Sequence, residues 1–205
     1  MPKHTDFAEL MASRLVHELV GPVGGVSAGI EMLGETGEAD PETLALLADS
    51  SGRASQRLQF FRLAYGCAGR APIGLDMLKS AVDGYLEKSS VSGLWSMKGD
   101  EAVLRKEGAG KCLLLAVEIA AASLLRGGRL SITAGGTETT VTARGTQATL
   151  RDEIAALLRT GGPEDDVSAN RVHAAYLYCL VNDIGGRIFV ETDTDTVTIR
   201  LLLPA

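Results

Sequence analysis

The chain of 205 residues is poor in aromatic side chains, in positive charge and in long apolar runs. Aromatic residues make up 4% of it, which is too few for the stacking platforms that bind single-stranded nucleic acid. The formal net charge of −6 disfavours both nucleic acid and an anionic membrane surface as partners. No apolar run approaches the roughly 18 residues of a membrane span. We therefore expect no nucleic-acid partner and no membrane partner.

Residues that ligate metals or form disulfides are also few. The three cysteines, at positions 67, 112 and 179, are too far apart for a CxxC pair or a disulfide framework. The three histidines, at positions 4, 17 and 173, lack the spacing of a zinc site. We expect no metal site. Unpaired cysteines and an N-terminus without the apolar region of a signal peptide predict a cytoplasmic location.

The first third of the chain has the pattern of two long helices. Apolar residues recur at steps of three and four over residues 7–33 and again over 44–65, which is the helical period. Asp40 is placed to cap the second helix, with Pro41 at its first position. The expected seams comprise Phe7, Met11, Leu15, Leu19, Val23, Val26, Ile30 and Leu33 in the first helix, and Leu44, Leu47, Ser51, Ala54, Leu58, Phe61 and Tyr65 in the second.

The short connection predicts an antiparallel helical hairpin, which we assign to a domain of residues 1–68. The small residues Ser51 and Ala54 are expected to let helices approach closely. A two-helix hairpin cannot bury both of its faces alone. Two interpretations stay open: a second copy completes a dimeric four-helix bundle, which we favour, or the hairpin packs on the rest of its own chain.

Residues 69–205 change to a mixed pattern and are assigned to a second domain. Helices are predicted at 75–88, 111–125, 150–158 and 169–184, and β-strands at 130–134, 139–144, 187–191 and 196–203. The whole chain is therefore placed in the α+β class, with a mixed sheet in the second domain that carries its helices on one face.

His17 is a candidate site because of its position on the first helix. At about 100° per residue it points about 200° away from Leu15, the centre of the apolar stripe, so its ring is expected in solvent. Pro22 lies in the same helix, where proline costs about 3 kcal/mol or more. A destabilising residue next to an exposed histidine indicates that the histidine is functional and not an inert surface residue.

The face around His17 is unusual because its residues are small or apolar, where a solvated helix would carry Lys and Glu. We interpret this face as a docking surface that brings another protein close to the imidazole. Its members are Leu10, Ser13, Val20, Gly21, Gly24 and Ala28.

Two charged residues flank the histidine and complete the candidate catalytic set of His17, Glu18 and Arg14. Arg14 lies one turn before His17 and is placed to neutralise anionic charge. Glu18 is expected to accept a hydrogen bond from one ring nitrogen, which leaves the other nitrogen free as a nucleophile.

Residues 17–23 (HELVGPV) resemble the H-box of histidine kinases, in which a His-Glu pair is followed by proline on the first helix of a dimerisation bundle. Residues 182–204 resemble the last helix and two strands of the kinase ATP-binding domain, and residues 113–130 its Asn-box helix. The resemblance covers most of the chain. It implies that the second domain is an α/β sandwich of the kinase ATP-binding type.

Three ATP-binding features of that family are missing from this sequence. Glu118 or Ile119 stands where the kinases carry a magnesium-binding Asn. Residues 144–148 (RGTQA) replace the Asp-x-Gly-x-Gly box, and residues 165–170 (DDVSAN) contain no glycine where the second Gly-rich box is expected. We therefore expect a degenerate domain that does not bind ATP.

A phospho-acceptor histidine joined to a degenerate kinase domain resembles the alphaproteobacterial histidine phosphotransferases of the ChpT type. The resemblance implies that His17 accepts a phosphoryl group from the receiver domain of a hybrid histidine kinase and passes it to response regulators. The receiver would bring its own magnesium, so no cofactor is expected in this chain. Gly21 stands where kinases often carry the side chain that positions a hydrolytic water, which predicts weak phosphatase activity.

Two alternatives stay open beside the phosphotransferase. An active sensor histidine kinase would need ATP binding. A non-catalytic adaptor would dock receiver domains without being phosphorylated. With no evident chemistry of its own, the second domain is expected to add surface for the partner.

Overall fold

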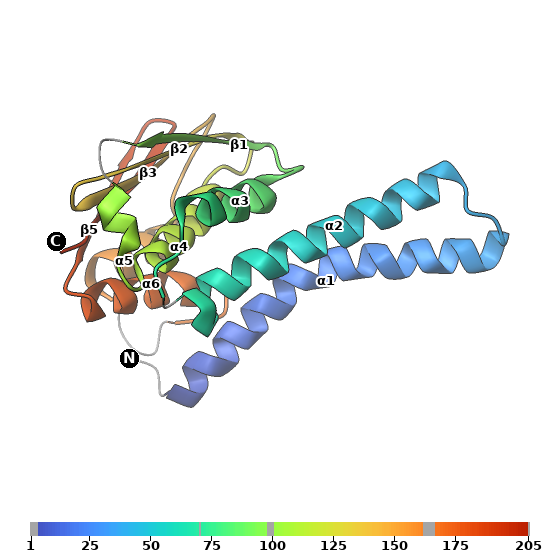
Figure 1. The fold of residues 1–205 in the computed structure, drawn as a ribbon, viewed down its shortest axis with the longest axis horizontal. Helices are drawn as coiled ribbons and strands as arrows, with labels where there is room; N and C mark the ends of the chain where they lie inside the picture. Colours follow the sequence, from blue (N-terminus) through green and yellow to red (C-terminus); the bar gives the residue numbers. More distant parts are fainter. Residues whose placement is uncertain (1–3, 70, 98–100, 162–166, 205) are drawn as a thin grey trace.

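A long helical hairpin projects from a lobe of helices and sheet (Figure 1). The computed structural model describes residues 4–69, 71–97, 101–161 and 167–204. The helices are α1 (His4–Thr36), α2 (Pro41–Ala64), α3 (Leu75–Leu86), α4 (Ala109–Ala122), α5 (Asp152–Thr160) and α6 (Val172–Asp183), with short 3-10 turns at Cys67–Gly69 and Glu101–Arg105. The strands are β1 (Val91–Met97), β2 (Gly128–Gly135), β3 (Glu138–Arg144), β4 (Arg187–Asp193) and β5 (Thr196–Leu202). Within the described ranges no helix is both long and apolar enough to cross a membrane.

The hairpin forms as the sequence predicts. Helix α1 continues through Pro22 without interruption. Helix α2 begins at the expected cap, where Oδ1 of Asp40 accepts hydrogen bonds from the backbone N–H groups of Glu42 and Thr43, both at 2.9 Å. Pro41 occupies the first helical position, where its missing N–H costs nothing.

The close approach of α1 and α2 uses different residues from those expected. A Cβ added to Gly25 would lie 2.4 Å from Oγ of Ser50, and one added to Gly29 would lie 2.7 Å from a methyl of Leu47. A larger residue at either position of α1 would force the side chain of Ser50 or Leu47 to shift. Within the single chain Ser51 is exposed while Ser50 is fully buried, so the close approach that Ser51 and Ala54 were expected to allow between helices stays a prediction for a second copy.

Part of each predicted apolar seam is left uncovered by the chain itself. Val23 and Ile30 of α1 are 52% and 59% exposed. Leu44 and Leu58 of α2 are 49% and 53% exposed. At its C-terminal end α2 instead buries Phe60, Leu63 and Ala64, which belong to the core of the lobe. Helix α2 therefore serves two interfaces, one with the lobe and one that the single chain does not fill.

The lobe is a five-stranded mixed sheet in the order β1-β2-β3-β5-β4, and its helices cover one face (Figure 1). Strands β1 and β2 are parallel, and the other neighbours are antiparallel. Residues 109–120 of α4 are all buried, as its apolar sequence predicts. The α+β class and the mixed sheet with helices on one face are confirmed. Strand β1 is an element that the sequence pattern did not indicate.

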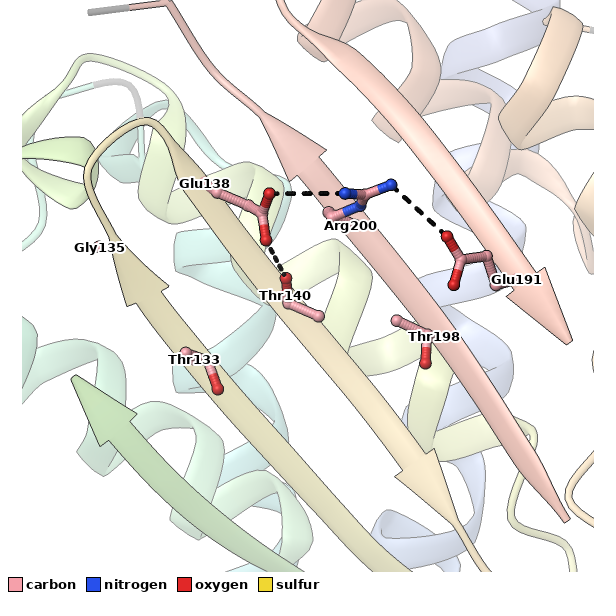
Figure 2. Close-up of a pocket in the computed structure, with 7 residues that line it drawn as sticks. All are labelled: Thr133, Gly135, Glu138, Thr140, Glu191, Thr198 and Arg200. Carbon is pink, nitrogen blue, oxygen red and sulfur yellow. Dashed lines mark hydrogen bonds and ion pairs between the residues drawn. The ribbon is translucent and has the colours of Figure 1, made fainter. Parts of the chain in front are cut away.

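The other face of the sheet is open and polar (Figure 2). Arg200 lies between two carboxylates there, with nitrogen–oxygen distances of 3.7 Å to Glu138 and 3.5 Å to Glu191. Its guanidinium also covers the ring of Phe189, at 4.8 Å from the centroid. Exposed ion pairs of this kind contribute little stability, about 0–1 kcal/mol each, so their effect is to keep this face solvated.

Candidate functional site

His17 lies on α1 with its side chain exposed. Around it, Ser13, Val20, Gly21, Gly24 and Ala28 of the expected docking face are exposed as well, and Leu10 is half-buried. A Cβ added to Gly21 or Gly24 would meet no atom within 4 Å. Within the described part of the chain no contact requires glycine at these two positions. Among the described residues no group of His, Cys, Asp and Glu is arranged to hold a metal ion.

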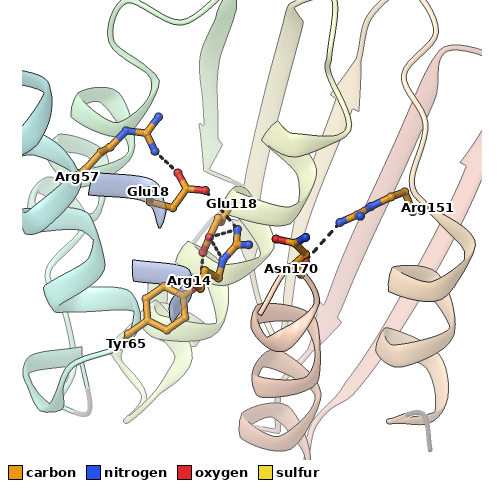
Figure 3. Close-up of polar contacts among 7 residues, drawn as sticks. All are labelled: Arg14, Glu18, Arg57, Tyr65, Glu118, Arg151 and Asn170. Carbon is orange, nitrogen blue, oxygen red and sulfur yellow. Dashed lines mark hydrogen bonds and ion pairs between the residues drawn. The ribbon is translucent and has the colours of Figure 1, made fainter. Parts of the chain in front are cut away.

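Arg14 points away from the open side of His17, contrary to the sequence-based expectation. Its Nε and Nη2 both donate to Oε1 of Glu118 on α4, at 2.9 Å and 2.5 Å (Figure 3). The Arg14 side chain is 11% exposed and that of Glu118 is fully buried. The physical reason is that a buried carboxylate needs a paired cation. Arg14 is therefore paired with the lobe, and its expected role toward a phosphoryl group stays a prediction.

Glu18 does not face the imidazole either. Its carboxylate pairs with Arg57 of α2, and its other oxygen lies 4.0 Å from Nη2 of Arg14 (Figure 3). Adjacent residues on a helix point about 100° apart, so Glu18 is turned toward α2 while His17 is turned toward solvent. The expected hydrogen bond between Glu18 and the ring of His17 is replaced by this bridge between two arginines.

Tyr65, which follows α2, completes the buried cluster around Glu118. Its hydroxyl donates to Oε2 of Glu118 at 2.5 Å (Figure 3). Burial raises the pKa of Tyr65 far above its usual value, so it stays a donor. Burial also raises the pKa of the Glu118 carboxyl, and Arg14 opposes that shift. The carboxylate of Glu118 on α4 thus binds one residue from α1 and one residue from the end of α2.

Aromatic packing extends this junction between hairpin and lobe. The ring of Tyr65 stacks on Tyr176 of α6 with centroids 6.1 Å apart and planes 13° apart. Phe7 of α1 packs against the same Tyr176 at 5.9 Å. The buried Lys111 donates to the Tyr176 hydroxyl at 3.0 Å. Sequence reasoning missed this junction, because its members are spread over the whole chain.

Glu118 and Asn170, which lie in segments that the kinase resemblance aligns with ATP-binding motifs, make contacts within the chain. Glu118, which with Ile119 is one of the two candidates for the Asn-box position, is bonded to Arg14 and Tyr65 as described. Nearby, Nη2 of Arg151 donates to the carbonyl of Asn170 at 3.3 Å, which ties the segment before α6 to the start of α5 (Figure 3). The acidic residues at 165 and 166 lie outside the described residues.

Comparison with known proteins assigns the family. The family model "Histidine phosphotransferase C-terminal domain" matches residues 75–196. Protein phosphotransferase ChpT of Brucella abortus (strain 2308) is 29% identical over 198 residues, which cover 94% of this chain and 93% of that protein. The solved structure "1.7 Angstrom Structure of a Bacterial Phosphotransferase" superposes with a TM-score of 0.85 at 25% identity, over 98% of both chains. The histidine kinase AdeS of Acinetobacter baumannii aligns over 91% of this chain and 96% of its own, with a TM-score of 0.47 and 10% identity. The chain belongs to the family defined by the histidine phosphotransferase C-terminal domain.

Proposed function

We propose that this protein is a histidine phosphotransferase of a two-component phosphorelay, and that His17 carries the phosphoryl group. The partners are the receiver domain of a hybrid histidine kinase upstream and the receiver domains of response regulators downstream. The observation that carries the proposal is an exposed histidine on a helix face of small residues, in a chain of this family. Exchange between such partners takes place in the cytoplasm, where the exposed thiol of Cys67 stays reduced.

The transfer reaction needs only one reactive group from this chain, the imidazole of His17. The unprotonated ring nitrogen of His17 attacks the phosphorus of the receiver's aspartyl phosphate. A nitrogen–phosphorus bond forms, the acyl phosphorus–oxygen bond breaks, and the aspartate leaves as a carboxylate. The proton on the other ring nitrogen passes to solvent as the phosphoryl group is transferred. Such transfers proceed through loose transition states and depend mainly on positioning and on charge neutralisation. The receiver's magnesium would supply the charge neutralisation.

Gly21 and Gly24 suit this reaction because they leave room beside His17. With no side chains there, the backbone of α1 is open to close approach by a partner. Gly21 also offers no group to hold a water molecule near a phosphorylated imidazole. We infer that phosphohistidine in this protein hydrolyses slowly, and that its main fate is transfer to a receiver.

A second copy of the chain is the proposed cover for the exposed apolar seam. An apolar groove between α1 and α2 is lined by Met11, Leu15, Leu19, Leu58 and Phe61, among others. Pairing two such hairpins gives a four-helix bundle. The seam residues Val23 and Ile30 lie more than 100° around α1 from His17, so this dimer leaves the histidine open. Sedimentation equilibrium is expected to give a dimer for the wild type and a monomer for Leu58→Glu.

We propose that transfer occurs without ATP-dependent kinase activity. The support is that Glu118, one of the two candidates for the magnesium-binding position of the kinases, has a buried carboxylate bonded to Arg14 and Tyr65, while the other candidate, Ile119, has no ligand atom. Millimolar ATP with magnesium is expected to leave the thermal unfolding midpoint unchanged and to give no labelled protein. A nucleotide-dependent increase in the midpoint together with labelling of His17 would establish the kinase alternative instead.

The phosphotransferase is tested by incubation with a labelled, phosphorylated receiver domain. The wild type is expected to acquire label, and His17→Ala is expected to acquire none. Glu31→Ala is the control, since it changes an exposed residue of the same helix that lies outside the docking face, about 21 Å from His17 along the helix, and should still accept label. Receiver binding without label on the wild type would favour the adaptor alternative.

A further inference from the structure

The geometry points to a positioning role for Arg14, Tyr65 and Glu118. We propose that these three residues, called the clamp below, hold the lobe in one orientation relative to the helix that carries His17. This orientation sets where an incoming receiver domain lies against the imidazole. The inference rests on the proposed function of His17. It assigns to Arg14 a role different from the neutralisation of phosphate expected from its place in the sequence.

The clamp joins three elements through one carboxylate. Arg14 of α1 donates twice to Oε1 of Glu118, and Tyr65 donates to Oε2. Both oxygens of the fully buried carboxylate are therefore used, each from a different part of the hairpin. The fork of a guanidinium fixes angle as well as distance, which a single ammonium would not. A contact of this kind selects one relative orientation of the α1 helix and the lobe.

A second layer of contacts restrains the clamp residues themselves. Glu18 lies beside Arg14 and pairs with Arg57 of α2, whose guanidinium covers the ring of Tyr85 on α3 at 5.4 Å. This bridge ties the hairpin to α3. On the other side, the stack of Tyr65 on Tyr176 ties the end of α2 to α6. The clamp is thus supported on two sides of the junction.

A buried ion pair is a poor choice if stability alone is at stake. Replacing such a pair by apolar side chains of similar volume is often neutral or stabilising, because desolvation offsets the attraction between the charges. The surrounding core of α4 is apolar and would accept such a replacement. Apolar contacts do not constrain the angle between the groups that they join, whereas hydrogen-bonded ion pairs do. We therefore infer that the clamp fixes the orientation of the lobe relative to α1.

The clamp lies close enough to His17 for orientation to matter. Arg14 precedes His17 by three residues, which is about 4.5 Å along α1 and about 60° around it. The lobe therefore stands directly beside the face that carries the histidine. A receiver is a domain of roughly 100 residues with a radius of gyration near 13 Å. We infer that a body of that size seated on His17 also contacts the lobe, so that the orientation of the lobe affects how the receiver docks.

The test uses an apolar replacement of the whole clamp, Arg14→Met with Tyr65→Phe and Glu118→Leu. This triple variant removes both charges and the hydroxyl together, so no buried polar group is left unpaired, and it keeps an aromatic ring against Tyr176. We expect a thermal unfolding midpoint within a few degrees of the wild type. Transfer from a phosphorylated receiver is measured over a range of receiver concentrations. The KM for the receiver should rise at least tenfold while kcat changes less than threefold.

The control is Arg200→Met with Glu138→Leu, which removes an exposed ion pair from the open face of the sheet. Its KM should equal that of the wild type. Should the triple variant fail to fold, Glu118→Gln alone keeps the shape of the carboxylate and should raise the KM at least threefold.

Two outcomes overturn the clamp while leaving the proposed function intact. One is transfer by the folded clamp variant with a wild-type KM, which would make the cluster a structural contact only. The other is a fall in kcat as large as the rise in KM, which would place the effect on the imidazole and not on docking. If the wild type itself accepts no phosphoryl group from any receiver, the proposed function fails and the clamp proposal fails with it.

Discussion

Gly25 of α1 faces Ser50 of α2 so closely that a Cβ on the glycine would lie 2.4 Å from the serine Oγ. This contact sets the distance between the two helices of the hairpin, and it explains a glycine in the interior of a long helix. It also separates two classes of glycine on α1. Gly25 and Gly29 pack closely against side chains of α2, whereas a Cβ added to Gly21, Gly24 or Gly34 would meet no atom within 4 Å.

Gly25→Ala is therefore expected to lower the free energy of unfolding. Overpacking a close contact typically costs about 1–3 kcal/mol, which outweighs the roughly 1 kcal/mol by which alanine favours a helix over glycine. Gly34→Ala is the control, because its Cβ would meet nothing within 4 Å and should stabilise the protein. Urea denaturation monitored by circular dichroism measures both. Equal stabilisation by the two substitutions would show that the helices are not this close.

Gly24→Ala is expected to separate stability from function. Its new methyl group meets nothing within the chain, so the helix should gain up to about 1 kcal/mol. The same methyl group projects from the face that we assign to the receiver and should raise the KM for transfer about tenfold. Gly34→Ala again serves as control, since it adds the same methyl about 25 Å from His17 along the helix and should leave the KM unchanged. A wild-type KM for Gly24→Ala would remove Gly24 from the docking surface.

His173 of α6 predicts an acid-sensitive fold. The residue is 3% exposed, and its Nδ1 finds no hydrogen-bond partner among the residues that the structure describes. Burial, with smaller effects from Arg14 and Arg151, holds the pKa of His173 well below its usual value. Below a pH of about 6.5 the unfolded chain therefore binds a proton that the folded chain does not. Stability is expected to fall as the pH falls, by up to about 2 kcal/mol between pH 6.5 and pH 5.

The measurement is the free energy of unfolding of the wild type and of His173→Gln at pH 7, 6 and 5. Carboxylates that titrate in both proteins cancel in the difference between the two. This difference should shrink or reverse toward pH 5, because only the wild type loses stability through His173. A difference that stays constant with pH would mean that the buried imidazole takes up a proton without cost.

The sequence was most informative where the signal is local. The cap at Asp40, the hairpin, the buried α4 and the exposure of His17 all follow from spacing within a few turns of helix or from single turn residues. The boundary between the domains at residues 68 and 69 stays a prediction. The roles of His17 and its docking face are likewise predictions, which the experiments above address.

The errors concern contacts between distant parts of the chain. Arg14 and Glu118 are 104 residues apart, so the helical pattern around Arg14 carries no sign of its partner. Residues 91–97 become a strand by parallel pairing with β2, although their burial shows no regular alternation. Helix α2 departs from its predicted seam where Phe60 and Leu63 turn into the core of the lobe. In each case a tertiary contact overrides the local pattern.

The central claim is that the relay passes through the imidazole at position 17. The most direct measurement is to phosphorylate the wild type with a phosphorylated receiver domain and to locate the group by tandem mass spectrometry under alkaline conditions, where phosphohistidine survives. We predict phosphohistidine at His17 and its loss on addition of a second, unphosphorylated receiver. Phosphorylation at His4 or His173, or a phosphoryl group on His17 that no receiver removes, would contradict the account.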